Sequence, residues 1–328
     1  MHSVSVLTTG GTIASRRDTS GRAVACDGAD ELLAALRRTT DVRITAEDVL
    51  RIGSYRMTLD RMAQIAGRAI ARLSDGGTAG VVVTHGTDTL EETALFLDLF
   101  VDGERPVVLT GAQRPADALD SDGPRNLADA VALAAHPDSR GLGALVVFDG
   151  TVLPARGIRK AHTLASSAFV SPDGGSLGWV HDGCVHLTRQ GRPRRCLDLS
   201  AFVPSRARVD IAACYPGADA TALRAFAQAG ARGLVLEATG AGNANPEICD
   251  AVAELSAAGI VVATSTRVAE GPVAAIYGDG GGADLLAAGA VPTGQLRPSQ
   301  ARIALAALLG VHEDPDAVRE LFPSICTD

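Results

Sequence analysis

Two short segments of the chain combine a threonine hydroxyl with glycines, and this combination suggests nucleophilic catalysis. The first segment is Thr9-Gly10-Gly11-Thr12-Ile13-Ala14, and the second is Thr84-His85-Gly86-Thr87-Asp88-Thr89. Glycine allows the backbone to approach a ligand and exposes amide N–H groups, while a threonine hydroxyl becomes a nucleophile when a neighbouring group activates it. We therefore select Thr12 and Thr87 as candidate catalytic residues.

Each segment also has a simpler explanation. The first could bind phosphate, but its spacing matches neither G-x-G-x-x-G nor G-x-x-x-x-G-K-[ST], which leaves a plain turn as the main alternative. In the second, Asp88 and Thr89 precede a predicted helix, where negative charge is favourable, so they could hold a substrate group or merely cap the helix. His85 has the chemistry of a general base, although a histidine beside glycine at a strand end is more often structural.

Lys160 is the third candidate, in the segment Arg156-Gly157-Ile158-Arg159-Lys160-Ala161-His162. Taken alone it reads as a surface lysine. A lysine amine, with an unperturbed pKa of ~10.4, acts as a base near neutral pH only when desolvation lowers that pKa strongly. A group of Thr87, Lys160 and Asp88 would then follow the logic of nucleophile, base and orienting acid. Sequence spacing does not establish that contact.

The elements that would position these residues alternate between strands and helices. In the first half of the chain, the predicted strands are residues 4–7, 80–83, 106–109 and 144–148, and the predicted helices are residues 29–38, 58–73, 90–100 and 124–135. Thr58 is expected to cap the second helix, and Thr89 followed by Glu92 has the form of a capping box. Such alternation predicts a parallel sheet, which binds ligands outside the carboxyl ends of its strands.

A second, shorter alternation follows the polar stretch 190–195. Its predicted strands are residues 209–214, 233–236 and 260–263, and its predicted helices are residues 219–229, 246–258, 299–309 and 316–322. We therefore predict an α/β fold with two domains. A larger N-terminal parallel-sheet domain would span residues 1–190, a linker 191–208, and a smaller C-terminal flavodoxin- or Rossmann-like domain 209–328.

Composition excludes several classes of function. The net charge of −8 argues against nucleic acid as the main partner, because that binding depends on Lys and Arg neutralising phosphates. No apolar run approaches the roughly 20 residues that cross a bilayer, so no membrane span is expected. The amino terminus carries no basic segment followed by an apolar one, and we expect a cytoplasmic protein. The six cysteines form no C-x-x-C pair, so we expect buried free thiols and no metal site.

Taken in order, the two threonine segments resemble the signatures of the bacterial L-asparaginase family. The second signature extends through Leu90-Glu91-Glu92-Thr93. The likeness continues along nearly the whole chain, through Ile52-Gly53-Ser54, Leu109-Thr110-Gly111-Ala112-Gln113-Arg114, the Lys160 segment and Gly242-Asn243-Ala244-Asn245.

This resemblance implies an amidohydrolase that converts L-asparagine to L-aspartate and ammonia without metal or organic cofactor. Thr12 would be the nucleophile, with Thr87, Lys160 and Asp88 as the second catalytic group, although the order in which the two threonines act stays open. The implied substrate-binding residues are Gly11, Ser54, Tyr55, Gly86, Ala112 and, from a neighbouring subunit, Asn245. The resemblance also implies a homodimer or homotetramer with the active site at a subunit interface.

Two departures from the family pattern are visible. Residues 15–30 contain no tyrosine, where many members carry one in a mobile loop, and Tyr55 follows Ser54 where secreted members commonly have glutamine. Other readings also stay open. These are a subunit that supplies ammonia for transamidation of tRNA, a non-catalytic amino-acid binding protein and a nucleotide-dependent oxidoreductase, because fold alone does not fix function.

Overall fold

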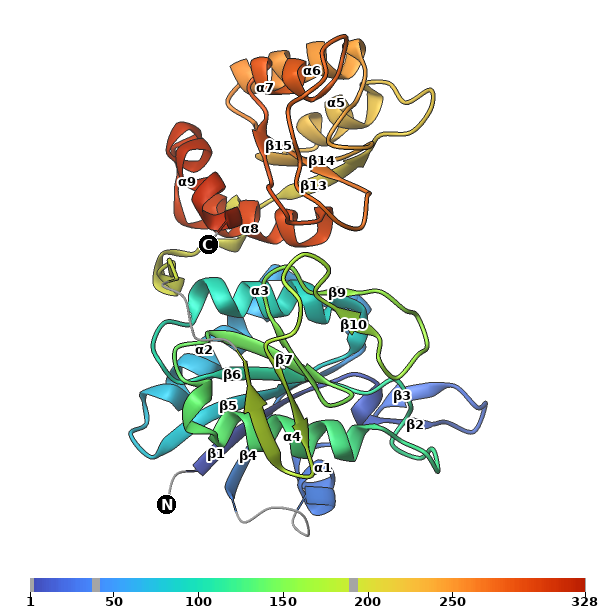
Figure 1. Ribbon diagram of the computed structural model, residues 1–328, viewed down its shortest axis with the longest axis vertical. Helices are drawn as coiled ribbons and strands as arrows, with labels where there is room; N and C mark the ends of the chain where they lie inside the picture. The colour runs from blue at the N-terminus through green and yellow to red at the C-terminus, as the bar shows by residue number, and fades with distance from the viewer. Residues whose placement is uncertain (1–2, 37–41, 189–193, 328) are drawn as a thin grey trace. The chain divides into compact units, whose positions relative to one another are not determined.

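The computed structural model describes residues 3–36, 42–188 and 194–327. The chain divides into two compact units, the first ending at Cys196 and the second beginning at Leu197. Each unit has its own sheet and its own helices (Figure 1), so the predicted two-domain α/β fold is confirmed. Residues 191–193 of the predicted linker lie outside the described residues. The rest of it contains two short 3₁₀ helices, η5 (Leu199–Ala201) and η6 (Pro204–Arg206).

The first unit is built on an eight-stranded sheet. In spatial order its strands are β12 (Cys184–Leu187), β11 (Gly178–His181), β8 (Thr151–Pro154), β7 (Ala144–Phe148), β6 (Val107–Thr110), β5 (Thr78–Thr84), β1 (Ser3–Gly10) and β4 (Arg43–Ile52). The strands from β7 to β4 run parallel, whereas β8, β11 and β12 continue the sheet in antiparallel fashion. The sheet is therefore mixed.

Helices cover both faces of this sheet, as Figure 1 shows. They are α1 (Ala29–Leu36), α2 (Leu59–Ser74), α3 (Leu90–Phe100) and α4 (Gly123–Ala135). Helices α1 and α4 pack together on one face, and α2 packs with α3 on the other. Burial on both faces explains why β5, β6 and β7 are nearly continuous apolar runs, which made these strands recognisable in the sequence.

Two helix caps were predicted, Thr58 for α2 and Thr89 for α3. Thr58 does cap α2, since its hydroxyl accepts a hydrogen bond from the Arg61 backbone N–H at 3.4 Å. The capping box predicted at Thr89 was wrong. The Thr89 side chain makes no capping bond and instead donates to the carbonyl oxygen of Ser54 at 2.9 Å. Thr89 thereby ties the second threonine loop to the loop that follows β4.

The second unit has a four-stranded parallel sheet in the order β13 (Val209–Ala213), β14 (Gly233–Ala238), β15 (Val261–Thr266) and β16 (Val291–Pro292). Its helices are α5 (Thr221–Gln228), α6 (Pro246–Ala257), α7 (Gly282–Ala287), α8 (Pro298–Val311) and α9 (Pro315–Thr327). All three predicted strands and all four predicted helices are present. In the described parts of both units, every helix is too short or too polar to cross a bilayer.

The expectation that all six cysteines are buried was wrong for three of them. Cys214, Cys249 and Cys326 are buried as predicted, but Cys26 and Cys184 are exposed and Cys196 is half-buried. None of the six forms a disulfide. Cys184 is exposed because β12 is the last strand of its sheet, and among the described residues no strand pairs with its outer edge.

Candidate active site

Four neighbouring parallel strands of the first unit, β6, β5, β1 and β4, end at one edge of the sheet. Thr8 of β1 lies opposite Thr84 of β5, and Thr84 lies opposite Thr110 of β6, so these strands are in register near their ends. The loops that follow therefore emerge side by side. In the same spatial order they carry Gln113, the Thr87 loop, the Thr12 loop and Ser54.

The Thr12 and Thr87 loops touch through their glycines. A Cβ atom added to Gly11 would lie only 2.4 Å from both the N and Cα atoms of Gly86. Gly11 also has a φ of 77° and a ψ of −175°, a conformation that residues with a side chain rarely adopt. Glycine at both positions thus lets the two backbones meet, and it places the two threonine segments next to each other.

Thr87, Lys160 and Asp88 form one hydrogen-bonded group, although 72 residues separate the lysine from Asp88 along the chain. Lys160 Nζ donates to Thr87 Oγ1 at 2.7 Å and to Asp88 Oδ1 at 3.2 Å. The Thr87 residue is only 5% exposed, whereas the Asp88 side chain is 53% exposed. The hydroxyl is thus shielded from water while the carboxylate faces solvent.

Lys160 reaches this group from a β-hairpin. It belongs to β9 (Arg159–Lys160), which pairs in antiparallel fashion with β10 (Phe169–Val170). Its backbone N–H donates to Glu91 Oε2 at 2.6 Å, which anchors the hairpin to the start of α3. Lys160 is also the only lysine in the sequence, since every other Lys or Arg position holds arginine.

Ser54 and Asp88 are directly connected. Ser54 is 3% exposed, and its Oγ accepts a hydrogen bond from the Asp88 backbone N–H at 3.2 Å. As an acceptor here, Ser54 keeps its own hydroxyl hydrogen to donate to an anion. Tyr55, by contrast, is 76% exposed, and Ala112 is fully buried.

Thr12 lies in a short 3₁₀ turn, η1 (Thr12–Ala14), and is half-buried. Within the described part of the chain, no group hydrogen-bonds its hydroxyl. The segment that follows forms the hairpin of β2 (Ser15–Arg17) and β3 (Ala23–Ala25), held by a bond from the Ala116 N–H to the Ser15 carbonyl at 2.9 Å. This hairpin occupies the place of the expected mobile loop and brings no tyrosine to Thr12.

His85 is structural, as its position beside glycine suggested. It is fully buried, with Nδ1 2.7 Å from the Gly86 carbonyl oxygen and Nε2 3.0 Å from Thr93 Oγ1. A carbonyl only accepts, so Nδ1 carries the hydrogen and Nε2 accepts from Thr93. Burial lowers the pKa of His85 to about 4, which keeps the ring neutral at neutral pH. With both nitrogens engaged, the ring is not available as a base.

Gln113 is a site residue that the sequence analysis did not select. Its Oε1 accepts a hydrogen bond from Thr87 Oγ1 at 3.1 Å, so it contacts the same hydroxyl as Lys160. Its sequence signals were its place in the loop after a buried strand and its position in the segment from Leu109 to Arg114 that resembles the family. The sole lysine was a stronger and unused signal for Lys160.

Asn245 lies in the second unit, where it caps α6. Its Oδ1 accepts from the Ile248 N–H at 2.9 Å and its Nδ2 donates to the Ala218 carbonyl at 2.8 Å.

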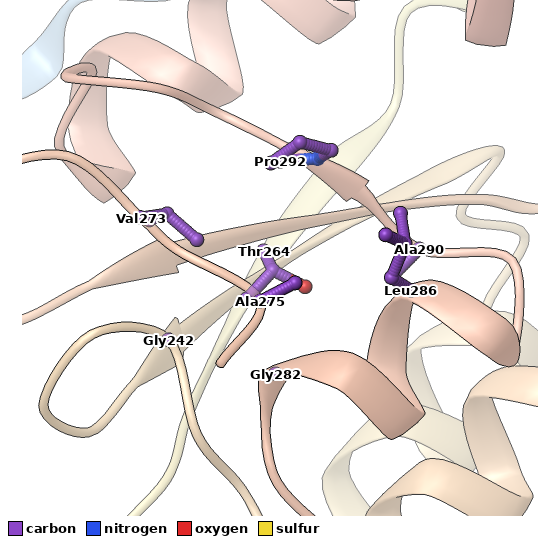
Figure 2. Close-up of a pocket in the computed structure, with 8 residues that line it drawn as sticks. All are labelled: Gly242, Thr264, Val273, Ala275, Gly282, Leu286, Ala290 and Pro292. Carbon is purple, nitrogen blue, oxygen red and sulfur yellow. The ribbon is translucent and has the colours of Figure 1, made fainter. Parts of the chain in front are cut away.

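The second unit also contains a cavity of about 80 Å³ at the end of β15. Figure 2 shows its lining of small and apolar residues, Gly242, Thr264, Val273, Ala275, Gly282, Leu286, Ala290 and Pro292. Because no lining residue is charged, the cavity does not suit an amino-acid substrate.

The described residues contain no cluster of three or more His, Cys, Asp or Glu side chains arranged to hold a metal ion. At the strand ends, the candidate reactive groups are the hydroxyls of Thr12 and Thr87, the amine of Lys160 and the carboxylate of Asp88. This set can perform nucleophilic acyl transfer with proton shuttling.

Comparison with known proteins identifies relatives of the whole chain. Residues 3–192 match the family "Asparaginase, N-terminal", and residues 208–322 match "Glutaminase/Asparaginase C-terminal domain". A probable periplasmic L-asparaginase from Haemophilus influenzae is 35% identical over 326 residues, covering 97% of this chain and 92% of that protein. A glutaminase-asparaginase from Pseudomonas fluorescens is 35% identical over 278 residues, covering 82% and 76%. A crystal structure of a probable cytoplasmic L-asparaginase from Campylobacter jejuni matches with a TM-score of 0.87 and 34% identity, covering 98% of this chain and 99% of that one.

Proposed function

Because the chain belongs to the asparaginase/glutaminase family, we propose that it is an L-asparaginase (EC 3.5.1.1), which hydrolyses L-asparagine to L-aspartate and ammonia. The observation that carries the proposal is the contact between Lys160 Nζ and Thr87 Oγ1 at 2.7 Å, beside the Thr12 loop. Arginine stays protonated in proteins, whereas a lysine amine can lose its proton. The chain has arginine at every other Lys or Arg position and lysine only here. This choice is consistent with a role that requires a neutral amine.

In the proposed reaction, Thr12 Oγ1 attacks the side-chain carbonyl carbon of asparagine. The carbon–nitrogen bond breaks, the nitrogen takes up the proton released by Thr12, and ammonia leaves. An ester between Thr12 and the aspartyl group remains. Water then attacks the ester carbon while the pair of Thr87 and Lys160 accepts one of its protons. The bond to Thr12 Oγ1 breaks, the pair passes that proton to Thr12 Oγ1, and aspartate leaves once its new carboxyl group has lost its proton to solvent. The assignment of the first attack to Thr12 follows the family resemblance.

The α-groups of the substrate have suitable partners at the same edge of the sheet. We assign the α-ammonium group to the exposed Asp88 carboxylate and the α-carboxylate to the Ser54 hydroxyl, whose hydrogen is available. The backbones of Gly11 and Gly86 and the loop at Ala112 would border the substrate. Tyr55 would contribute from the exposed rim.

Ammonia release from L-asparagine by single variants tests the assignment. Thr12→Ala, Thr87→Ala and Lys160→Arg are each expected to lose activity by at least ~100-fold, because each removes a nucleophile or a proton acceptor. Matched controls are Thr188→Ala, an exposed threonine of the first unit, and Arg159→Lys, which neighbours Lys160. Near-parental rates in both threonine variants would show that the assignment is wrong.

L-Glutamine is a second candidate substrate because the Pseudomonas fluorescens relative is a glutaminase-asparaginase. The two amides differ by one methylene, which discriminates by only ~1–3 kcal/mol in a pocket. Values of kcat/KM for both amides, measured over a wide concentration range, decide the preference. Tight asparagine binding without turnover would instead favour a non-catalytic binding protein.

Self-association and location complete the proposal. We propose a homodimer or homotetramer in which Asn245 of one copy borders the site of another, although Asn245 would have to add this contact to its capping bonds within α6. Sedimentation analysis at several concentrations tests this, and a monomer with full activity would contradict it.

A cytoplasmic location is supported by the Campylobacter jejuni relative, while the Haemophilus influenzae relative is described as periplasmic. Cell fractionation distinguishes the two.

A further inference from the structure

The side chain of Gln113 lies between Thr87 and the loop of the β9–β10 hairpin. Its Oε1 is 3.1 Å from Thr87 Oγ1, and its Nε2 donates to the carbonyl oxygens of Thr163 at 3.2 Å and Ala165 at 3.0 Å. Carbonyl oxygens only accept, so the NH₂ group must face them and Oε1 must face Thr87. The partners of the Gln113 amide therefore fix its orientation.

This orientation decides where the Thr87 hydrogen points. A protonated Lys160 can only donate, so at 2.7 Å it makes Thr87 Oγ1 an acceptor, and the single Thr87 hydrogen then goes to Gln113 Oε1. When Lys160 is neutral, its lone pair can accept that hydrogen instead. Thr87 is only 5% exposed, so water does not readily replace either partner.

The backbone that carries Gln113 is itself held firmly. Both carboxylate oxygens of Asp122 accept from the Gln113 N–H, at 3.1 and 3.0 Å, and one of them also accepts from the Arg114 N–H at 2.9 Å. Asn126 Nδ2 donates to Asp122 at 3.3 Å and to the Gly111 carbonyl at 3.0 Å. The loop after β6 is thus cross-linked to α4, and the Gln113 side chain extends from a fixed point.

We propose that Gln113 is a positioning residue that accepts the Thr87 hydrogen while Lys160 is protonated and clamps the hairpin that carries Lys160. The proposal rests on the function proposed above, because it concerns the proton that Thr87 and Lys160 share. It predicts that the protonation of Lys160 depends on whether residue 113 can accept a hydrogen bond.

Because the sequence contains a single lysine, this dependence can be measured directly. Protein grown with ¹³Cε-lysine gives one lysine Cε signal, and its chemical shift against pH reports the titration of Lys160. Gln113→Met has a similar length but neither donor nor acceptor, whereas Gln113→Glu keeps an acceptor toward Thr87 and adds negative charge. Both variants lose the two bonds to the hairpin carbonyls. Arg114→Met is the matched control, since the Arg114 side chain is exposed.

In Gln113→Met, charged Lys160 would leave the Thr87 hydrogen without an acceptor, so the titration midpoint should move to lower pH by about half a pH unit or more. In Gln113→Glu the added charge should move the midpoint to higher pH, and in Arg114→Met it should not move. The kcat of Gln113→Met for asparagine should fall roughly tenfold or more, with KM within about threefold of the parent, because the lost contact is to a reacting group rather than to the substrate.

A purely structural role for Gln113 would affect both variants alike, because both lose the bonds to the hairpin. Midpoints that move in the same direction, or that do not move, would therefore overturn the proposal. If Gln113→Met does not fold, Gln113→Glu decides, and a midpoint that fails to rise overturns it. If the parent protein releases no ammonia, the proposed function fails, but the titration still decides the role of Gln113.

Discussion

The contact between Gly11 and Gly86 holds the two threonine loops together, and Gly11→Ala would break it. The new Cβ would lie 2.4 Å from two backbone atoms of Gly86 and 2.9 Å from the His85 carbonyl carbon. Ordinary van der Waals contact begins near 3.4 Å, so the loops must separate by about 1 Å. No flexible side chain can move aside to absorb this change, because the contacted atoms are all backbone.

The expected loss has two parts. Alanine at the φ of 77° and ψ of −175° of Gly11 costs about 1–3 kcal/mol in backbone strain. Overpacking a fixed contact costs about 1–3 kcal/mol more. The free energy of unfolding should thus fall by roughly 2–6 kcal/mol. A displacement of ~1 Å between catalytic groups should lower kcat by about 100-fold, even in the protein that remains folded.

Gly183→Ala is the matched control. Gly183 has the same φ of +77°, but a Cβ there would meet no atom of the described residues within 4 Å. Thermal unfolding and ammonia release from L-asparagine are measured for both variants. The control should lose stability by ~1–3 kcal/mol and keep its activity. A folded Gly11→Ala protein with kcat within threefold of the parent would refute the idea that this glycine contact sets the distance between the threonine loops.

Three further predictions concern other parts of the molecule. Burial raises the pKa of Asp129 to about 6, so the folded state binds the proton of the Asp129 carboxyl group more tightly than the unfolded chain does. The stability gained from this proton is lost as pH rises through about 6. Asp129→Asn should therefore raise the free energy of unfolding at pH 8 by up to ~3 kcal/mol and change it little at pH 4, as denaturant titrations at both pH values would show. Thr264 Oγ1 is buried without a hydrogen-bond partner in the described structure, so Thr264→Val should raise the free energy of unfolding by about 1 kcal/mol; a lower melting temperature would indicate that the hydroxyl has a bound partner. Iodoacetamide should alkylate Cys26 and Cys184 in the native protein and the buried cysteines only after unfolding, which peptide mass spectrometry would detect.

The parts of the fold that the sequence predicted are those with one clear physical signal. Strands such as β5 and β7 are covered on both faces and are therefore apolar throughout, and α2 has a threonine cap and a regular apolar stripe. β4 was missed because it is an edge strand that is nowhere fully buried and carries charged residues along its length. The strands β8, β11 and β12 were missed because each has four residues, too few to show an alternating pattern.

The residues of the site also fall into some that the sequence predicted and some that it did not. The threonine loops were predictable because glycine and hydroxyl residues directly follow buried strands. The contact of Lys160 with Thr87 was not, because it depends on a hairpin whose strands have two residues each and on a bond to Glu91. The role of Gln113 depends on carbonyl groups of that same hairpin, and backbone acceptors have no sequence signature.

Asp88 and Thr87 both contact Lys160, but they differ in exposure and therefore in how strongly each contact holds the lysine. Lys160 and Asp88 form an ion pair in which the carboxylate is 53% exposed, and exposed pairs contribute little, ~0–1 kcal/mol. Asp88 can therefore orient the amine while contributing little to the stability of the group. The 2.7 Å bond to Thr87 lies on the buried side, where losing a partner is more costly than in water. The hydrogen-bond geometry of the group is thus set mainly by the Thr87 hydroxyl and by Gln113, which contacts that hydroxyl.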